Sequence, residues 1–246
     1  MTTPTPVTAT APGTAPSDGW LSDALHAVES DPTSIGSVFG SVGRHVGRGP
    51  VDKAGDPRGI HGTVDDAARA QLVQSLARSA SPSETAERLT ALYRAGDTAE
   101  KRGVLRGLDA LTGDGTINPA PLPASVPNPL VAAGTALVTD ALRTNDPSLV
   151  AAATGPFTAA HLDQHAWRHA VLKLVFMGVP LDAVAGLDER ADDELARMAA
   201  DFAAERRAAG RTVPDDLARI TGAGSTSAGT DRAPEPGPAA PEKKDA

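Results

Sequence analysis

Three histidines spaced four residues apart, His161, His165 and His169, have the types and spacing that could bind a metal ion. On one continuous helix, imidazoles at positions i and i+4 lie on the same face and can share a zinc ion. Asp163, however, is a typical helix N-cap and would leave His161 outside that helix. No Glu follows the first His of either pair, so the general base of the zinc-protease helix is missing. We therefore predict neither a metal site nor another cofactor, and expect histidines that are solvated or hydrogen-bonded.

The segment that follows Asp163 carries two cations, Arg168 and Lys173, among large apolar side chains. Apolar residues there cover nearly every side of a helix, and such a helix usually lies at the centre of a domain. Both cations would then be partly buried and would need carboxylate partners. The candidate partners are Asp140, Asp146 and Asp182. A structural ion pair is the favoured interpretation. A cation that faces a ligand in a cleft is the alternative, because buried charges gather at functional sites.

A second basic cluster, with Arg44 and Arg48, lies in the sequence GRHVGRGP over residues 43–50. Its glycines suggest a phosphate-binding loop, but no strand is expected before it. Neither the Walker spacing nor Gly-x-Gly-x-x-Gly is present. Arginines near the carbonyl groups at the C-terminus of a helix explain the cluster equally well. Anion binding here is the less favoured alternative.

The sequence contains no recognisable catalytic constellation. The chain has no cysteine, which removes thiolate chemistry, disulfides and cysteine-ligated metals. It also lacks the Gly-x-Ser-x-Gly nucleophile elbow. Acidic pairs occur at residues 65–66, 192–193 and 215–216. Each is expected at a helix start or on an exposed charged face, where capping and solubility account for it.

The composition indicates a soluble, acidic protein. The 246 residues include 23 Lys and Arg against 31 Asp and Glu, a net charge of −8. Without a basic block, nucleic-acid binding is not expected. The absence of cysteine fits a reducing cytoplasm. No apolar run reaches the roughly 20 residues of a membrane span, and no secretory signal is visible. We expect a cytoplasmic protein that does not insert into membranes.

The chain divides into one domain and segments that cannot build a core. Residues 1–17 and 221–246 lack large apolar side chains apart from Met1 and Val7. They cannot offset an ordering cost of roughly 1–2 kcal/mol per residue, so we predict disordered tails. Residues 113–129 contain five prolines and predict a loop. Residues 18–220 are expected to fold as one helical domain around this Pro-rich loop.

Helical patterns dominate that domain. Apolar side chains recur every three or four residues, while the alternation typical of strands is scarce. Thr63 with Asp66 and Asp97 with Glu100 predict capping boxes at two helix starts. A long apolar stripe near the C-terminus predicts one helix from Asp188 to about Ala209. The predicted fold class is all-α, either an α-solenoid-like array, which we favour, or an irregular helical bundle.

Four stretches of sequence then carry a family resemblance. They are VGRHVGRGPV at 42–51, ALRTNDPSLVAA at 141–152, HLDQHAWRHAVLKLVFMGVPL at 161–181 and DFAAERRAAGR at 201–211. Together they resemble the EboA-domain family of bacteria over most of residues 20–220. The resemblance implies an all-helical protein of secondary metabolism, encoded beside a membrane prenyltransferase and a TIM-barrel protein. Such proteins are expected to help a cytoplasmic precursor reach its processing site across the membrane.

The resemblance also directs attention to particular positions, without assigning any of them a catalytic role. They are Arg143, Asn145, Asp146, Trp167, Arg168, Lys173, Gly178 and Pro180. The first six of these, with Arg44 and Arg48, are our candidates for binding a ligand or a partner. The expected partners are the products of neighbouring genes or a small metabolite.

Two functions follow as hypotheses. The favoured one is a non-enzymatic helical accessory protein that binds a partner protein or a small metabolite and assists biosynthesis or export of a precursor. The alternative is an enzyme, metal-dependent in one version, that acts on an anionic small molecule through Arg44, Arg168 and Lys173. A peripheral membrane adaptor is disfavoured, because no basic amphipathic helix is evident.

Overall fold

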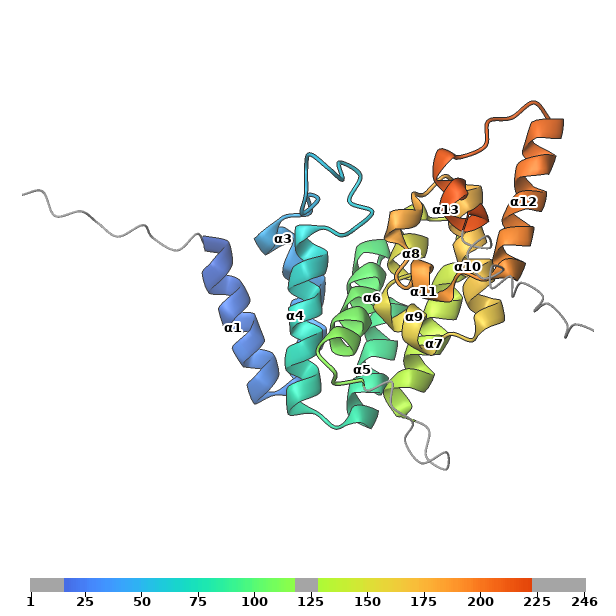
Figure 1. Ribbon diagram of the computed structural model, residues 1–246. Coiled ribbons are helices and arrows are strands. Elements are labelled where there is room, and N and C mark those ends of the chain that lie inside the picture. The colour runs from blue at the N-terminus through green and yellow to red at the C-terminus, as the bar shows by residue number, and fades with distance from the viewer. Residues whose placement is uncertain (1–15, 118–127, 223–246) are drawn as a thin grey trace, which may run out of the picture.

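The computed structural model describes residues 16–117 and 128–222, whose regular elements are helices apart from one isolated β-bridge (Figure 1). The first stretch holds α1 (Pro16–Ser30), η1 (Pro32–Ser34), α2 (Ile35–Val38), η2 (Phe39–Ser41), α3 (Val42–Val46), α4 (Val64–Ser79), α5 (Pro82–Ala95) and α6 (Thr98–Gly113). The second holds α7 (Pro129–Leu142), α8 (Pro147–Ala152), α9 (Pro156–His161), α10 (Gln164–Met177), η3 (Leu181–Ala183), α11 (Leu187–Arg190), α12 (Asp193–Ala208), η4 (Asp215–Leu217) and α13 (Ala218–Thr221). The all-α prediction is confirmed.

The helices pack as an array of stacked neighbours. Helix α1 packs on α4 and α4 on α6, so the three stand in a row (Figure 1). Helices α5 and α7 pack on each other and on α6, while α8 and α9 cover the rest of α6. Each helix mainly contacts elements close to it in the sequence, which is the solenoid-like packing that the helical pattern favours.

Capping boxes fix the starts of the last three helices of the first stretch, α4, α5 and α6. In each box, the side chain of the N-cap residue accepts a hydrogen bond from the backbone N–H of the residue three positions later. The acidic side chain of that later residue accepts a hydrogen bond from the backbone N–H of the N-cap residue. The two boxes predicted from the sequence, at α4 and α6, are both present. A third opens α5. The three pairs are Thr63 with Asp66, Ser81 with Glu84, and Asp97 with Glu100.

Glycines allow α4 and α6 to approach closely. Gly103 and Gly107 lie one helical turn apart on α6 and are both buried. A Cβ at Gly107 would lie 2.6 Å from the Cβ of Val73 on α4, and one at Gly103 would overlap the side chain of Arg69. The absence of these two side chains lets the helices pack backbone to side chain along their middle.

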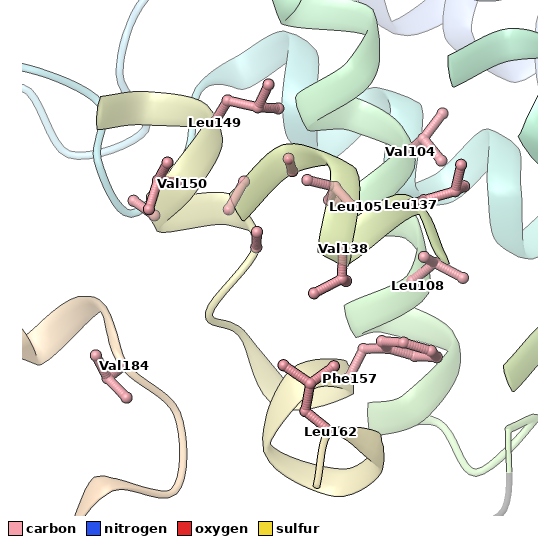
Figure 2. Packing of buried hydrophobic residues seen from close by; sticks show 14 of the residues in the cluster. Val104, Leu105, Leu108, Leu137, Val138, Leu149, Val150, Phe157, Leu162 and Val184 are labelled. Carbon is pink, nitrogen blue, oxygen red and sulfur yellow. The ribbon is translucent and has the colours of Figure 1, made fainter. Parts of the chain in front are cut away.

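A second close contact fills the core where α6, α7 and α9 meet. Phe157 of α9 is 1% exposed and packs beside Leu108 and Val138 in a cluster of buried side chains (Figure 2). Its ring lies against Gly134 of α7, where an added Cβ would lie 2.9 Å from Cε2 of the ring. Ring and glycine thus fix the distance between α7 and α9.

The predicted segment boundaries need small corrections. Residues 1–15, 118–127 and 223–246, which hold most of the predicted tails and Pro-rich loop, lie outside the described residues. Pro16 already belongs to α1, two residues before the domain was expected to begin. At the end of the first stretch, Ile117 is fully buried. Its backbone N–H donates to the Leu111 carbonyl, so the chain folds back onto α6.

The prediction of one helix from Asp188 to about Ala209 is wrong. The segment forms α11 and α12, with Ala191 and Asp192 extended between them. The carboxylate of Asp192 accepts a hydrogen bond from the backbone N–H of Leu195 at 3.0 Å and so starts α12 anew. An apolar stripe cannot reveal this break, because the side chains on both sides of it still face the core.

Helix α10 is buried on one side rather than on every side, which corrects the prediction of a central apolar helix. Trp167 and Val171 are fully buried, but Phe176 is 62% exposed and His165 and His169 are exposed. The helix is thus amphipathic. Among the described residues, no helix combines the length and apolar character needed to cross a membrane.

The α4–α6 contact yields a test of the packing. Ala normally stabilises a helix interior by about 1 kcal/mol relative to Gly. Because the new Cβ would meet Val73, we expect Gly107→Ala to lower the free energy of unfolding by about 1–3 kcal/mol instead. Urea denaturation followed by circular dichroism measures the change. Gly113→Ala is the matched control on the same helix, since its Cβ meets nothing within 4 Å. Equal effects at the two positions would contradict the close contact.

Candidate functional site

The most deeply buried cation of the described residues is Arg69 on α4, which the sequence analysis did not identify. Its guanidinium lies 2.5 Å from the carboxylate of Asp65, and both side chains are fully buried. Arg69 also donates to the Phe39 carbonyl at 3.2 Å and lies over the Phe39 ring. The available signal was the i, i+4 spacing of an acid and an arginine on one helix. The sequence predicts a capping role for residues 65–66, which holds for Asp66 but not for Asp65.

A line of polar contacts continues from this pair along α6. Arg102 binds the carboxylate of Asp66 at 2.8 Å and also reaches the Ser148 hydroxyl at 3.4 Å. Arg106, one turn on, donates to the Ile60 carbonyl at 2.9 Å in the loop between α3 and α4. These arginines tie α4, α6, α8 and the loop together, so their charges serve the fold.

Asp109 ends this line and is the most perturbed carboxyl of the helix. Its Oδ1 accepts a hydrogen bond from the backbone N–H of Phe157 at 3.0 Å, and Arg106 lies 3.5 Å from Oδ2. Burial raises the pKa of Asp109 to about 6, although both contacts favour the charged form. No pattern in the sequence distinguished this residue, because the N–H group that it binds, that of Phe157, belongs to a distant segment.

Arg168 is held by an ion pair, but not with any of the expected partners. Its guanidinium binds the carboxylate of Asp192 at 2.5 and 2.9 Å, whereas Asp140, Asp146 and Asp182 are not its partners. Asp192 is the N-cap of α12, so the pair ties α10 to that helix. Hydrogen bonds from Arg168 hold the pKa of Asp192 well below its usual range. The new start of α12 brings this carboxylate next to α10, which the continuous-helix prediction concealed.

Trp167 is a core residue with a cation above it. The indole is fully buried, and the guanidinium of Arg190 lies 4.9 Å from the ring centre. Arg190 also donates to the carbonyls of Ala159 and Leu162, at 2.7 and 2.9 Å. The arginine therefore caps the C-terminus of α9.

Lys173, in contrast, lines a groove between α10 and α12. The groove has a volume of about 440 Å³. Its apolar side chains include Phe176 and Phe202, whose rings meet edge to face at 4.5 Å between centres. His169 and Lys173 border it from α10, while Asp201 and Glu205 border it from α12; the remaining lining residues are Leu172 and Met198. Within residues 16–117 and 128–222, Lys173 has no carboxylate within ion-pair distance.

The three histidines do not gather at one point. His161 ends α9 and packs against Phe157, while His165 and His169 stack edge to face on α10 with their ring centres 4.5 Å apart. Burial lowers the pKa of His161. In the part of the chain that the structure describes, no three His, Cys, Asp or Glu side chains are arranged to hold a metal ion.

Arg44 and Arg48 lie at the opposite end of the array from α10 (Figure 1). Arg44 belongs to the last turn of α3, which Gly47 ends with a φ of 90°. Both arginines are exposed. This is the helix C-terminus that the sequence offered as one explanation. The structure does not bring Arg44 together with Arg168 and Lys173, as the enzyme hypothesis requires.

The turn between α7 and α8 has a clear structural role. The carboxylate of Asp146 accepts hydrogen bonds from the backbone N–H groups of Ser148 and Leu149, at 2.9 and 3.2 Å, and so caps α8. Asn145 is exposed. Arg143 follows the last turn of α7, is exposed, and borders a cavity on the side of α5 and α6.

Fold and groove together define an all-helical protein with a groove of small-molecule size near its C-terminal end. Residues 128–222 match the family model described as metabolite traffic protein EboA, so this part of the chain is similar to the EboA-domain family. The match spans α7 to α13 and includes the α10–α12 groove. It covers only the second part of the predicted domain 18–220, so the resemblance at residues 42–51 stays a prediction. Comparisons with curated proteins and with solved structures gave no match.

The buried pair on α4 leads to a double-variant test. Arg69→Met leaves the Asp65 carboxylate buried without its cation, and we expect the free energy of unfolding to fall by about 3–5 kcal/mol. The double variant Asp65→Leu/Arg69→Met removes both charges and should lose much less. Chemical denaturation of the three proteins measures the difference. A double variant as unstable as the single one would show that the charge itself is not the cause.

Asp109 leads to a test of pH dependence. Its folded pKa, about 6, lies above its ordinary value of 3.8, so its contribution to stability is full below pH 3.8 and is lost as the pH rises through 6. Asn carries no charge. Asp109→Asn should therefore gain stability relative to the natural protein between pH 4 and 7, by up to about 3 kcal/mol. Unfolding free energies across this range provide the measurement.

The matched control for this test is Asp114→Asn. Hydrogen bonds from Thr116 and Gln74 lower the pKa of Asp114, so the natural carboxylate stabilises the protein above its ordinary pKa. The variant should lose stability relative to the natural protein as the pH rises. If both variants shifted stability in the same direction, the cause assigned to Asp109 would be wrong.

Proposed function

We propose that this protein is a non-enzymatic binding protein that holds a small amphipathic metabolite in the groove between α10 and α12. The observation that carries the proposal is the groove itself. It lies in the region that matches the family model, and it combines an exposed phenyl ring, Phe176, with a cation, Lys173, that is not used by the fold. An exposed large apolar side chain beside an uncommitted charge is typical of a binding site.

The walls of the groove indicate the chemistry of the ligand. Leu172, Phe176 and Phe202 offer an apolar surface that suits an aromatic or branched aliphatic body. Lys173 on one wall suits an acid group, while Asp201 and Glu205 on the other accept hydrogen bonds or an amine. The volume of about 440 Å³ falls among those of small-molecule sites. A metabolite with an acid group at one end and a donor at the other fits best.

The family description supports a role in moving a metabolite rather than converting it. Within this proposal, the protein works in the cytoplasm of a bacterium and delivers a precursor of secondary metabolism to products of neighbouring genes. Delivery requires reversible binding, and an open groove between two helices allows a ligand to leave without unfolding of the array.

The enzyme alternative receives less support from the geometry. It requires Arg44, Arg168 and Lys173 to face one substrate, but Arg168 is paired with Asp192 and Arg44 lies on α3 at the other end of the array. Without convergence, these cations cannot act on one reacting group.

A retention experiment tests the proposal. The full chain is incubated with a small-molecule extract of its native host, separated by gel filtration, and the retained compounds are identified by mass spectrometry. We expect one compound class to be retained and its retention to fall at least about tenfold in Lys173→Met and in Phe176→Ser, because each removes one part of the groove.

Lys53→Met serves as the matched control, since Lys53 is an exposed lysine outside the groove. Circular dichroism checks that all variants are folded. Retention that is the same in the natural protein, the control and both groove variants would exclude this groove as the site.

A further inference from the structure

A second cavity lies between α5, α6 and α7, at a different place from the groove. Its volume is about 520 Å³. The three helices pack on one another, so rigid elements build its walls (Figure 1). Two of these helices, α5 and α6, precede the part of the chain that matches the family model.

The cavity gathers positive charge in an acidic protein. Arg94 of α5, Lys101 of α6 and Arg143 beyond α7 line it, against a single carboxylate, that of Asp140. The whole chain carries a net charge of −8, so a cluster of this sign is unexpected from the composition. In the two described stretches, none of these three cations lies within ion-pair distance of a carboxylate.

Tyr93 contacts both the carboxylate and one of the cations. Its hydroxyl donates a hydrogen bond to the carboxylate of Asp140 at 3.1 Å. The Nζ atom of Lys101 lies over its ring, 5.3 Å from the ring centre. Burial and the neighbouring Asp140 raise the pKa of Tyr93, so the phenol stays protonated and keeps donating this bond. Lys101 is half-buried and is stabilised by a ring rather than by an opposite charge. An anion in the cavity would complete its surroundings.

The cavity continues into a trough along α5 and α7. An adjacent hollow of about 390 Å³ shares Thr90, Arg94 and Ala133 with it and extends past Ala86 and Ala91. Apart from Glu87 and Arg94, small side chains border the trough, which suits an aliphatic chain. The cationic end and the narrow apolar path meet at Arg94.

We propose that this cavity binds an aliphatic phosphate ester, with the phosphate among Arg94, Lys101 and Arg143 and the alkyl chain in the trough. Three cations suit the two negative charges of a phosphate monoester beside one carboxylate, and arginine binds phosphate oxygens in a bidentate manner. This site is separate from the α10–α12 groove and does not depend on the function proposed for it.

The single tyrosine of the chain provides a direct readout of the site. Tyr93 is that tyrosine, so the NMR signals of a protein labelled only at tyrosine report on this cavity alone. The probe is octyl phosphate. We expect it to shift the Tyr93 signals in a saturable way, and more weakly at high salt, because the attraction is electrostatic. Octanol and inorganic phosphate, which each lack one half of the ligand, should bind at least about tenfold more weakly.

Octanoate, tested beside these probes, distinguishes a phosphate site from a general site for anionic chains. Lys101→Met and Arg143→Met should each weaken octyl phosphate about tenfold. Lys53→Met and Lys173→Met, which change lysines outside the cavity, should not. Arg143 is exposed, so its variant remains informative even where Lys101→Met unfolds.

Three outcomes would overturn the proposal. The first is a Tyr93 signal that octyl phosphate leaves unmoved. The second is binding by Arg143→Met that equals that of the natural protein. The third is binding of octanol or octanoate as tight as that of octyl phosphate. Tight octanol binding would indicate an apolar trough only, and tight octanoate binding would indicate a site that does not select phosphate.

Discussion

The structure depends on one constraint, the burial of a full positive charge between α4 and α6. Arg69 is removed from water completely, which is costly unless an opposite charge and further hydrogen bonds surround it. Asp65 and the Phe39 carbonyl supply them, and Gly103 leaves the space that the long side chain occupies. The distance between α4 and α6 is therefore fixed by a polar group as well as by apolar packing. The rest of the array is built outward from this pair of helices.

Helix α6 links the α4–α6 pair to the C-terminal half of the array. Its arginines, one turn apart, bind the start of α4, the loop before it and the start of α8, and Asp109 meets the start of α9. These contacts lie on the faces that α6 buries. The face toward α5 and α7 carries Lys101, which does not join α6 to another helix through an ion pair. The cavity opens at this face. The polar side chains on the buried faces of α6 therefore stabilise the fold, while Lys101 on another face can bind a ligand.

Prediction from the sequence succeeded where the deciding contacts are local. The capping boxes at Thr63 and Asp97 involve residues three apart, so the helix starts and the all-α class could be predicted. It failed where a partner is distant in sequence. The ion pair of Arg168 depends on Asp192 starting a new helix, and the position of Phe176 depends on which side of α10 the array covers. Periodicity gives the faces of a helix but not which neighbour, or water, each face meets.

The described cations divide into two kinds, and the division separates stability from binding. Arg69, Arg102 and Arg168 each have a carboxylate, so their charge is already matched and offers little to a ligand. Lys101 and Lys173 border cavities, and neither has a carboxylate within ion-pair distance among the described residues. The sequence favours a structural ion pair for both cations of α10, and Arg168 has one, with Asp192. A desolvated charge must be satisfied by the fold itself, whereas a half-exposed charge at a cavity can gain a partner when a ligand arrives.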